Sequence, residues 1–160
     1  MAEFTFMMNS RGNGRPAFEY PLDRLLRING IISKELLLSP DMLDSNNEPC
    51  LLVIKDGNTT GVTIGRATGM ESFVRDYVTG EESTELAVYN YDKDSNSFSA
   101  MGDSGSLIVD GLGRMAGLLT GGTSKSNLET VDVSYATPLW WLMLRIKAKY
   151  PHADLFRETF

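Results

Sequence analysis

After position 50 the chain alternates between short runs of branched apolar residues and clusters of Gly, Asp, Asn and Ser. Apolar runs bounded by turn-forming residues are typical of β-strands joined by tight turns. We expect strands at 50–55, 62–68, 72–78, 85–91, 106–110, 114–120 and 130–137. Strands at such spacing predict a mainly β fold, either a sandwich or a small antiparallel barrel.

The first third of the chain has a different pattern. Apolar residues recur at helical spacing over 21–38 but are interrupted by Gly30, which predicts two short helices or a helix and a turn. Residues 1–20 are expected to be an irregular lead, because helix-breaking residues crowd 9–16. We therefore expect residues 1–49 to form an N-terminal extension or linker with short helices.

A second helical pattern lies near the C-terminus. Apolar residues spaced by three and four run from Leu139 to Tyr150, with cations between them and in the last turn. Pro138 stands near the first turn and Pro151 follows the last one, positions that suit the two ends of a helix. The sequence predicts an amphipathic C-terminal helix, so residues 50–160 are expected to form one barrel with this helix.

Composition narrows the classes of function. The 160 residues carry a formal net charge of -6, which argues against sequence-independent binding to nucleic acid or anionic membranes. No apolar run approaches the roughly 18 residues of a membrane span.

Cys50 is the sole cysteine, so an internal disulfide is impossible. With no signal-peptide pattern after Met1, an intracellular location is favoured. We expect no cofactor or metal, because His152 stands alone and the 92–97 loop lacks the glycine and distal glutamate of a calcium loop.

One loop carries a candidate nucleophile. Ser104 lies within Gly102-Asp103-Ser104-Gly105, directly before the expected strand at 106–110. Glycines on both sides leave the hydroxyl accessible and let backbone N–H groups converge where an oxyanion forms. The nucleophile elbow of α/β-hydrolases does not fit, because it needs glycine two residues after the serine and then a helix. The simpler alternative is a structural Gly-Ser turn leading into a strand.

Several other stretches of the sequence, together with the serine loop, form a recognisable pattern along the chain. They are the hairpin at 55–65, the serine loop and strand at 102–109, the hairpin at 113–122, and the strand at 135–139 with the helix after it. In this order they resemble the second, C-terminal β-barrel of chymotrypsin-like (trypsin-fold) serine peptidases. The likeness covers residues 50–150 and is closest to fungal trypsin-like proteins without disulfides, in which a segment like 18–43 links two barrels. It implies a six- to seven-stranded antiparallel chymotrypsin-like barrel.

The resemblance also implies roles for individual residues. Ser104 is the acylating nucleophile, and the oxyanion hole is the loop of Gly102, Asp103 and Ser104, with the Gly102 and Ser104 amides as donors. Asp103 pairs internally with a cation, which the sequence alone does not identify. The expected substrate pocket is formed by Phe98, Ser99, Met101, Thr120, Gly121, Gly122 and Val133. Its walls are apolar, so cleavage after Lys or Arg is not expected.

The chain departs from that family at the other two catalytic positions. A serine hydroxyl needs a histidine to take its proton and a carboxylate to orient that histidine. The only histidine, His152, follows the C-terminal helix, and Asp23 has no histidine beside it in the sequence. The segment before position 50 is too short to form a first barrel. We therefore expect the serine-bearing half of an endopeptidase, inactive alone, whose His and Asp come from an N-terminal barrel.

A second hypothesis belongs to a different class. A barrel without its partner exposes the apolar face that the two halves normally share. The chain is then a non-enzymatic pseudopeptidase that binds protein through the barrel cleft or through this face, or self-associates as a homo-oligomer through this face. Residues 1–45 are expected to fold over it. A polypeptide substrate belongs only to the first hypothesis.

Overall fold

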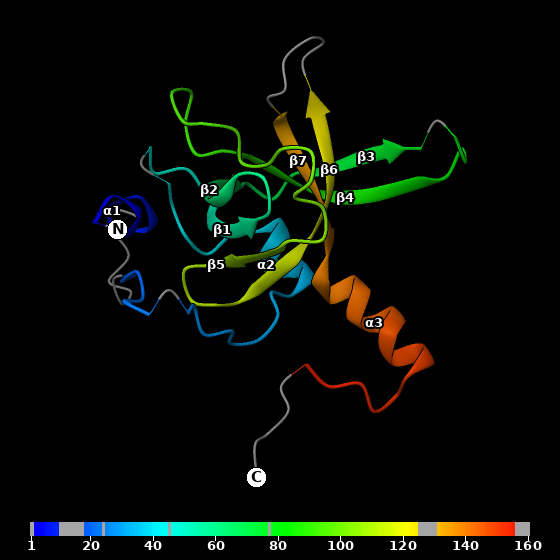
Figure 1. The fold of residues 1–160 in the computed structure, drawn as a ribbon. Coiled ribbons are helices and arrows are strands. Elements are labelled where there is room, and N and C mark those ends of the chain that lie inside the picture. Colours follow the sequence, from blue (N-terminus) through cyan, green and yellow to red (C-terminus); the bar gives the residue numbers. More distant parts are fainter. Residues whose placement is uncertain are drawn as a thin grey trace.

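The computed structural model describes residues 2–9, 18–23, 25–44, 46–76, 78–124 and 131–155. Its centre is a closed antiparallel barrel of six strands, to which a seventh strand is added (Figure 1). The strands are β1 (Leu51–Gly57), β2 (Gly61–Ala67), β3 (Glu71–Arg75), β4 (Glu82–Asn90), β5 (Leu107–Asp110), β6 (Met115–Ser124) and β7 (Val131–Pro138). The expectation of a mainly β, antiparallel barrel is confirmed.

The ring closes between β2 and β4. Strand order is β2-β1-β5-β6-β7-β4-β3, and β2 also pairs with β4 through Gly65↔Asn90 and Arg66↔Tyr89. Gly65 allows this closure, because a Cβ there would lie 2.6 Å from the Phe98 ring and 2.7 Å from the Tyr89 carbonyl oxygen. Strand β3 pairs with β4 alone and therefore lies outside the ring.

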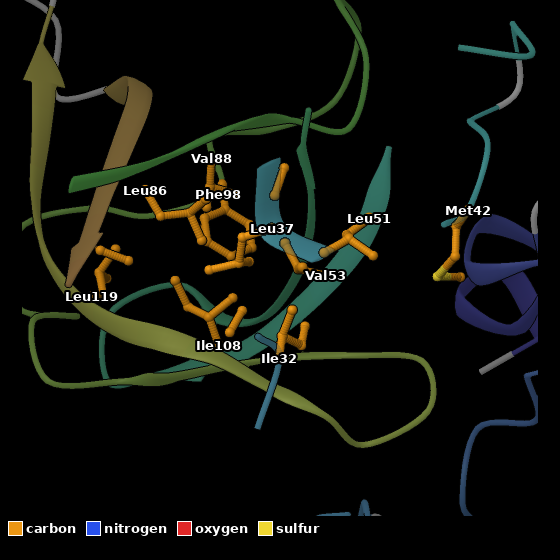
Figure 2. Packing of buried hydrophobic residues seen from close by; sticks show 13 residues of the cluster. Ile32, Leu37, Met42, Leu51, Val53, Leu86, Val88, Phe98, Ile108 and Leu119 are labelled. Atoms are coloured by element: carbon orange, nitrogen blue, oxygen red, sulfur yellow. The ribbon is translucent and has the colours of Figure 1, made fainter. Parts of the chain in front are cut away.

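Successive side chains of β1 point alternately to the barrel interior and to its outer face, so they belong to two separate apolar clusters. Leu51 and Val53 point into the barrel, where Phe98 is fully buried among side chains from several strands (Figure 2). Leu52 and Ile54 point to the outer side and join a second cluster. The two-residue period of a strand thus gives a filled interior and an apolar outer face.

The N-terminal segment covers that outer face and differs from expectation. The first residues form a helix, α1 (Ala2–Met8), and not an irregular lead. Phe4, Met7 and Met8 pack against the outer cluster at helical spacing. Asn9 connects α1 to Phe18, because its side chain donates to Thr5 O at 2.7 Å and accepts from Phe18 N at 2.7 Å. The loop expected at 9–16 lies largely outside the described residues.

Only the second half of the 21–38 pattern is helical. The short helix α2 (Lys34–Leu38) begins after Ser33, whose Oγ accepts from Leu36 N at 3.3 Å. Before it, Ile32 N donates to Met115 O and Met115 N donates to Gly30 O, both at 2.9 Å. These backbone groups are bonded to β6 and are unavailable to a helix. Of the two expected arrangements, the structure therefore shows a helix and a turn and not two short helices.

The C-terminal helix α3 (Leu139–Lys149) is confirmed. It buries Leu139 and Met143 against the outer face of the barrel. The two adjacent tryptophans lie in different environments: Trp140 packs on the interior cluster, whereas Trp141 is 41% exposed. None of the helices in the described ranges has the length and apolarity needed to cross a membrane.

Candidate active site

Ser104 lies in the turn immediately before β5, with its side chain exposed. Its Oγ is 3.4 Å from Thr120 O, to which it donates. The neighbouring Gly105 N donates to Leu119 O at 2.7 Å, and Leu119 N donates to Ser106 O at 3.0 Å. These hydrogen bonds to β6 fix the serine just before the start of β5 and bring Ser104 and Thr120 together.

The backbone amides around Ser104 fall into two groups. Asp103 N donates to Ala100 O at 3.1 Å, and Gly105 N is bonded as described above. In the described chain, the Gly102 and Ser104 amides have no acceptor. Gly102 has a φ of +100°, a left-handed conformation that favours glycine. The loop therefore keeps two amide donors unpaired beside an exposed hydroxyl.

Asp103 anchors this loop from below. Its side chain is fully buried and accepts hydrogen bonds from Thr59 N at 2.7 Å, Thr60 N at 3.2 Å, Thr60 Oγ1 at 2.7 Å and Ala100 N at 3.0 Å. A further bond from Thr59 Oγ1 to Met101 O, at 2.8 Å, ties the β1–β2 turn to the serine loop. The position of Ser104 is thus set by a residue that itself faces inward.

The cation beside Asp103 is Lys55. Its Nζ lies 3.4 Å from Asp103 Oδ2, and both side chains have no exposed area. The same Nζ donates to Thr60 Oγ1 and to Gly61 O, the latter at 3.0 Å. Lys55 therefore links the carboxylate to the turn after β1.

Burial and hydrogen bonding have opposite effects on the pKa of Asp103. Burial acts to raise the pKa of Asp103, but hydrogen bonds from Thr60, Ala100 and Thr59 outweigh it and hold this pKa well below its ordinary value. Burial lowers the pKa of Lys55, and the adjacent Asp103 carboxylate partly offsets that effect. The Asp103 carboxyl is consequently held as an anion.

The alternation of side chains along β1 is the sequence signal that identifies Lys55 as an inward-facing residue. Positions 51, 53 and 55 share one side of β1, so the alternation that turns Leu51 and Val53 inward also turns Lys55 inward. A buried lysine needs an anionic partner. Gly57, at the end of the same strand, leaves room for the pair, because a Cβ there would overlap the Asp103 carboxylate.

The residues expected to form a substrate pocket occupy different environments. Phe98 and Ser99 lie in the barrel interior, where Ser99 Oγ is 2.7 Å from Ser134 Oγ. Met101 is 94% exposed, and Thr120 is exposed beside Ser104. Farther along β6, Gly121 is half-buried and Gly122 exposed, and half-buried Val133 on β7 pairs with Thr123.

Within the described part of the chain, neither His152 nor Asp23 forms a hydrogen bond with the serine loop. His152 is exposed in the segment after α3, and the Asp23 carboxylate accepts from Leu25 N at 3.0 Å within its own turn. Cys50 is fully buried, and burial raises the pKa of its thiol to about 12, as expected of an inert core cysteine. Among the described residues, no three His, Cys, Asp or Glu side chains gather as metal ligands.

A cavity of about 570 Å³ lies elsewhere, between the N-terminal segment and the outer face of β1, β2 and β5. Its apolar lining includes Phe4, Tyr20 and Leu26 from the segment and Ile54, Val62 and Val109 from the barrel. Lys55 also lines this cavity, whereas no residue of the serine loop at 98–106 does.

Comparison with known proteins gave no matching family model and no significantly similar curated protein.

Proposed function

We propose that this chain is the serine-bearing half of a trypsin-like serine endopeptidase, with Ser104 as the acylating nucleophile and a polypeptide as substrate. In this reaction Ser104 Oγ attacks the scissile carbonyl carbon, and its proton passes to a histidine. The Gly102 and Ser104 amides donate to the resulting oxyanion. The C–N bond then breaks, and the departing amine takes the proton from the histidine.

The observation that carries the proposal is the combination of an exposed serine hydroxyl with two unpaired amides on one anchored loop. Donors fixed in advance contribute most to such reactions, and loss of one typically costs about 10² to 10³ in rate. A structural Gly-Ser turn does not require unpaired amides, nor a buried ion pair beneath the serine. The Lys55–Asp103 pair also supplies the internal cation that the family resemblance implies.

The general base is the missing component. His152 is the sole histidine of the sequence and lies beyond α3. The proposal therefore needs a second barrel that brings a histidine and an aspartate, on the same polypeptide or on another. The chain by itself is expected to be inactive towards peptides.

An added base can replace the missing histidine in a test on this chain. We expect a fluorophosphonate to label Ser104 slowly, with loss of fluoride from phosphorus, and imidazole in solution to raise the rate by accepting the serine proton. Labelling is located by peptide mass spectrometry. Exposed Ser83 on β4 serves as an internal reference, because it lies on a regular strand and not on a loop with unpaired amides.

Two variants define the result. Ser104→Ala removes the label, whereas Ser106→Ala retains it, because the Ser106 hydroxyl is committed to Asp103 O at 2.7 Å. Labelling of Ser104 no faster than that of Ser83, with imidazole present, contradicts the proposal.

A non-catalytic binding module is the second candidate, and one observation favours it. The apolar outer face of the barrel is already covered by the chain's own N-terminal residues Phe4, Met7, Met8, Phe18, Tyr20, Leu26 and Ile31. This arrangement suits a pseudopeptidase whose own segment has replaced the catalytic partner. A normal fold with no imidazole-dependent labelling is the outcome that supports it.

A further inference from the structure

We propose that two copies of this chain associate through the free edge of β3, in antiparallel register about Phe73. This edge is remote in sequence from the serine loop, and its pairing does not depend on the reaction proposed for Ser104. Three features of β3 favour the pairing: the direction of its backbone groups, the exposure of Phe73 and the order of charges along the strand.

Strand β3 has an open edge. It pairs with β4 on one side, and no other strand of the described chain pairs with it. Figure 1 shows the β3–β4 hairpin extending away from the barrel. An open edge presents unpaired N–H and C=O groups, to which another strand can bind.

The backbone hydrogen bonds at the two ends of the β3–β4 pair show which residues face this edge. Asp76 N donates to Glu81 O at 2.9 Å, and Ala87 N donates to Met70 O at 3.1 Å. Even-numbered residues of β3 are therefore bonded to β4, and the alternation of an antiparallel pair turns the odd-numbered ones outward. The outward N–H and C=O groups belong to Glu71, Phe73 and Arg75.

The side chains of these three residues are exposed on one side of the strand. Phe73 is 86% exposed, although phenylalanine is among the residue types most often fully buried in folded proteins. Glu71 and Arg75 are also exposed, and Arg75 has only a loose contact with Glu82, at 3.9 Å between two exposed side chains. A partner strand at this edge would cover the ring and reach both charges.

The sequence Glu71-Ser72-Phe73-Val74-Arg75 is complementary to itself when reversed. In a two-fold pairing centred on Phe73, each Glu71 stands opposite Arg75 of the other copy, and the two Phe73 rings are opposite each other. All three pairs are odd-numbered, so they are the pairs whose backbone groups face the edge and can exchange two hydrogen bonds each. Charges at an edge normally prevent association, but here their order favours one partner, a second copy.

The expected dimer is weak because two five-residue strands bury little area. A dissociation constant of about 10 µM to 1 mM suits an interface smaller than the standard size. Sedimentation equilibrium over this range should show a concentration-dependent dimer. Amide signals of Glu71, Phe73 and Arg75 should shift on dilution more than those of Ser72 and Val74.

Charge reversal gives the decisive experiment. Glu71→Arg or Arg75→Glu alone places like charges in both cross-edge pairs, and each should weaken the dimer by about tenfold. An equal mixture of the two variants restores opposite charges in both pairs and should associate as well as the unchanged chain. The double variant Glu71→Arg/Arg75→Glu should also associate.

The matched control for Arg75→Glu is Lys147→Glu, which makes the same change in net charge at an exposed position on α3. It should leave the dissociation constant unchanged. A chain that stays monomeric throughout this range overturns the proposal. So does a dimer that neither single variant weakens, or a mixture that associates no better than its components. Thermal unfolding of each variant verifies that the β3–β4 hairpin and barrel remain folded.

Discussion

Lys55 Nζ lies 3.4 Å from Asp103 Oδ2, and neither side chain is exposed. A buried ion pair is not by itself a stabilising feature, because removing both charges from water costs about as much as their attraction returns. Its role here is positional. It joins the end of β1 to the residue before Ser104, so the serine loop is fixed by the barrel interior.

A double-mutant cycle tests this coupling. Lys55→Met and Asp103→Asn should each lower the free energy of unfolding by about 3–5 kcal/mol, because each leaves a buried polar group without its partner. The double variant should lose much less than the sum. Urea unfolding measures all four proteins, and additive losses would show that the two side chains are not coupled. Lys55→Met should also slow fluorophosphonate labelling of Ser104.

Stability should fall in acid. The pKa of Asp103 is lowered on folding, so its contribution is present above the unfolded value of 3.8 and is lost as pH falls from 3.8 through the folded value. Asp44 acts with the same sign: burial opposes the shift, but bonds from Glu48, Asn46 and Arg66 lower its pKa. Urea midpoints measured from about pH 6 down to about pH 2.5 should decrease below about pH 4.

Asp103→Asn is the control for that profile. It should be less stable near neutrality and show a shallower decrease in acid, because one of the carboxyl groups whose pKa is lowered on folding has been removed. An equal slope in both proteins would assign the acid effect to other carboxylates.

Gly57 is predicted to be required because a larger side chain would not fit beside Asp103, and not because of its backbone conformation. A Cβ at this position would overlap the Asp103 carboxylate and approach Lys55 Nζ to 2.9 Å. Gly57→Ala should therefore destabilise the protein by about 1–3 kcal/mol, as overpacking does. Gly121→Ala is the matched control, because a Cβ there meets no atom within 4 Å, and its effect should stay within about 0.5 kcal/mol. Similar losses in urea unfolding would contradict this account.

The strands were readable from the sequence because their signals are local. Each expected strand overlaps an observed one, from 50–55 against β1 to 130–137 against β7. Turn residues mark the ends of such segments, and two-residue alternation separates the faces. The helix at 139–149 was equally readable, because its apolar spacing and flanking prolines lie within one short window.

The anchoring of the serine loop was not readable, because it joins segments far apart in sequence. Thr59 N and the Asp103 carboxylate are separated by 44 positions. Alternation orients Lys55 inward but does not say which loop it meets. Likewise, the helical spacing over 21–38 could not show that Ile32 and Gly30 would bond to Met115 of β6. Pairing with a strand removed the backbone groups that a helix requires.

Arg114 should attach the segment before the barrel to the β5–β6 turn. Its Nε donates to Asp110 Oδ2 at 2.6 Å, and its two terminal nitrogens donate to the Asp41 carboxylate at 3.2 and 3.1 Å. The Asp110 side chain is fully buried, so Arg114→Met leaves it without its cation and should cost about 3 kcal/mol. Detachment at Asp41 should also expose α2, so trypsin should cleave after Lys34 faster.

The variant Arg114→Lys tests whether the positive charge of Arg114 or the planar shape of its guanidinium group holds the segment. Lysine restores a cation but lacks the planar fork that contacts two carboxylates at once. It should recover part of the stability while leaving cleavage after Lys34 faster than in the unchanged chain. Full protection by lysine would mean that charge alone holds the segment, whereas no loss in Arg114→Met would mean that the segment is held by its apolar contacts. The forked geometry at Asp41 and Asp110 favours the intermediate result, because each carboxylate is bonded by a different part of one guanidinium.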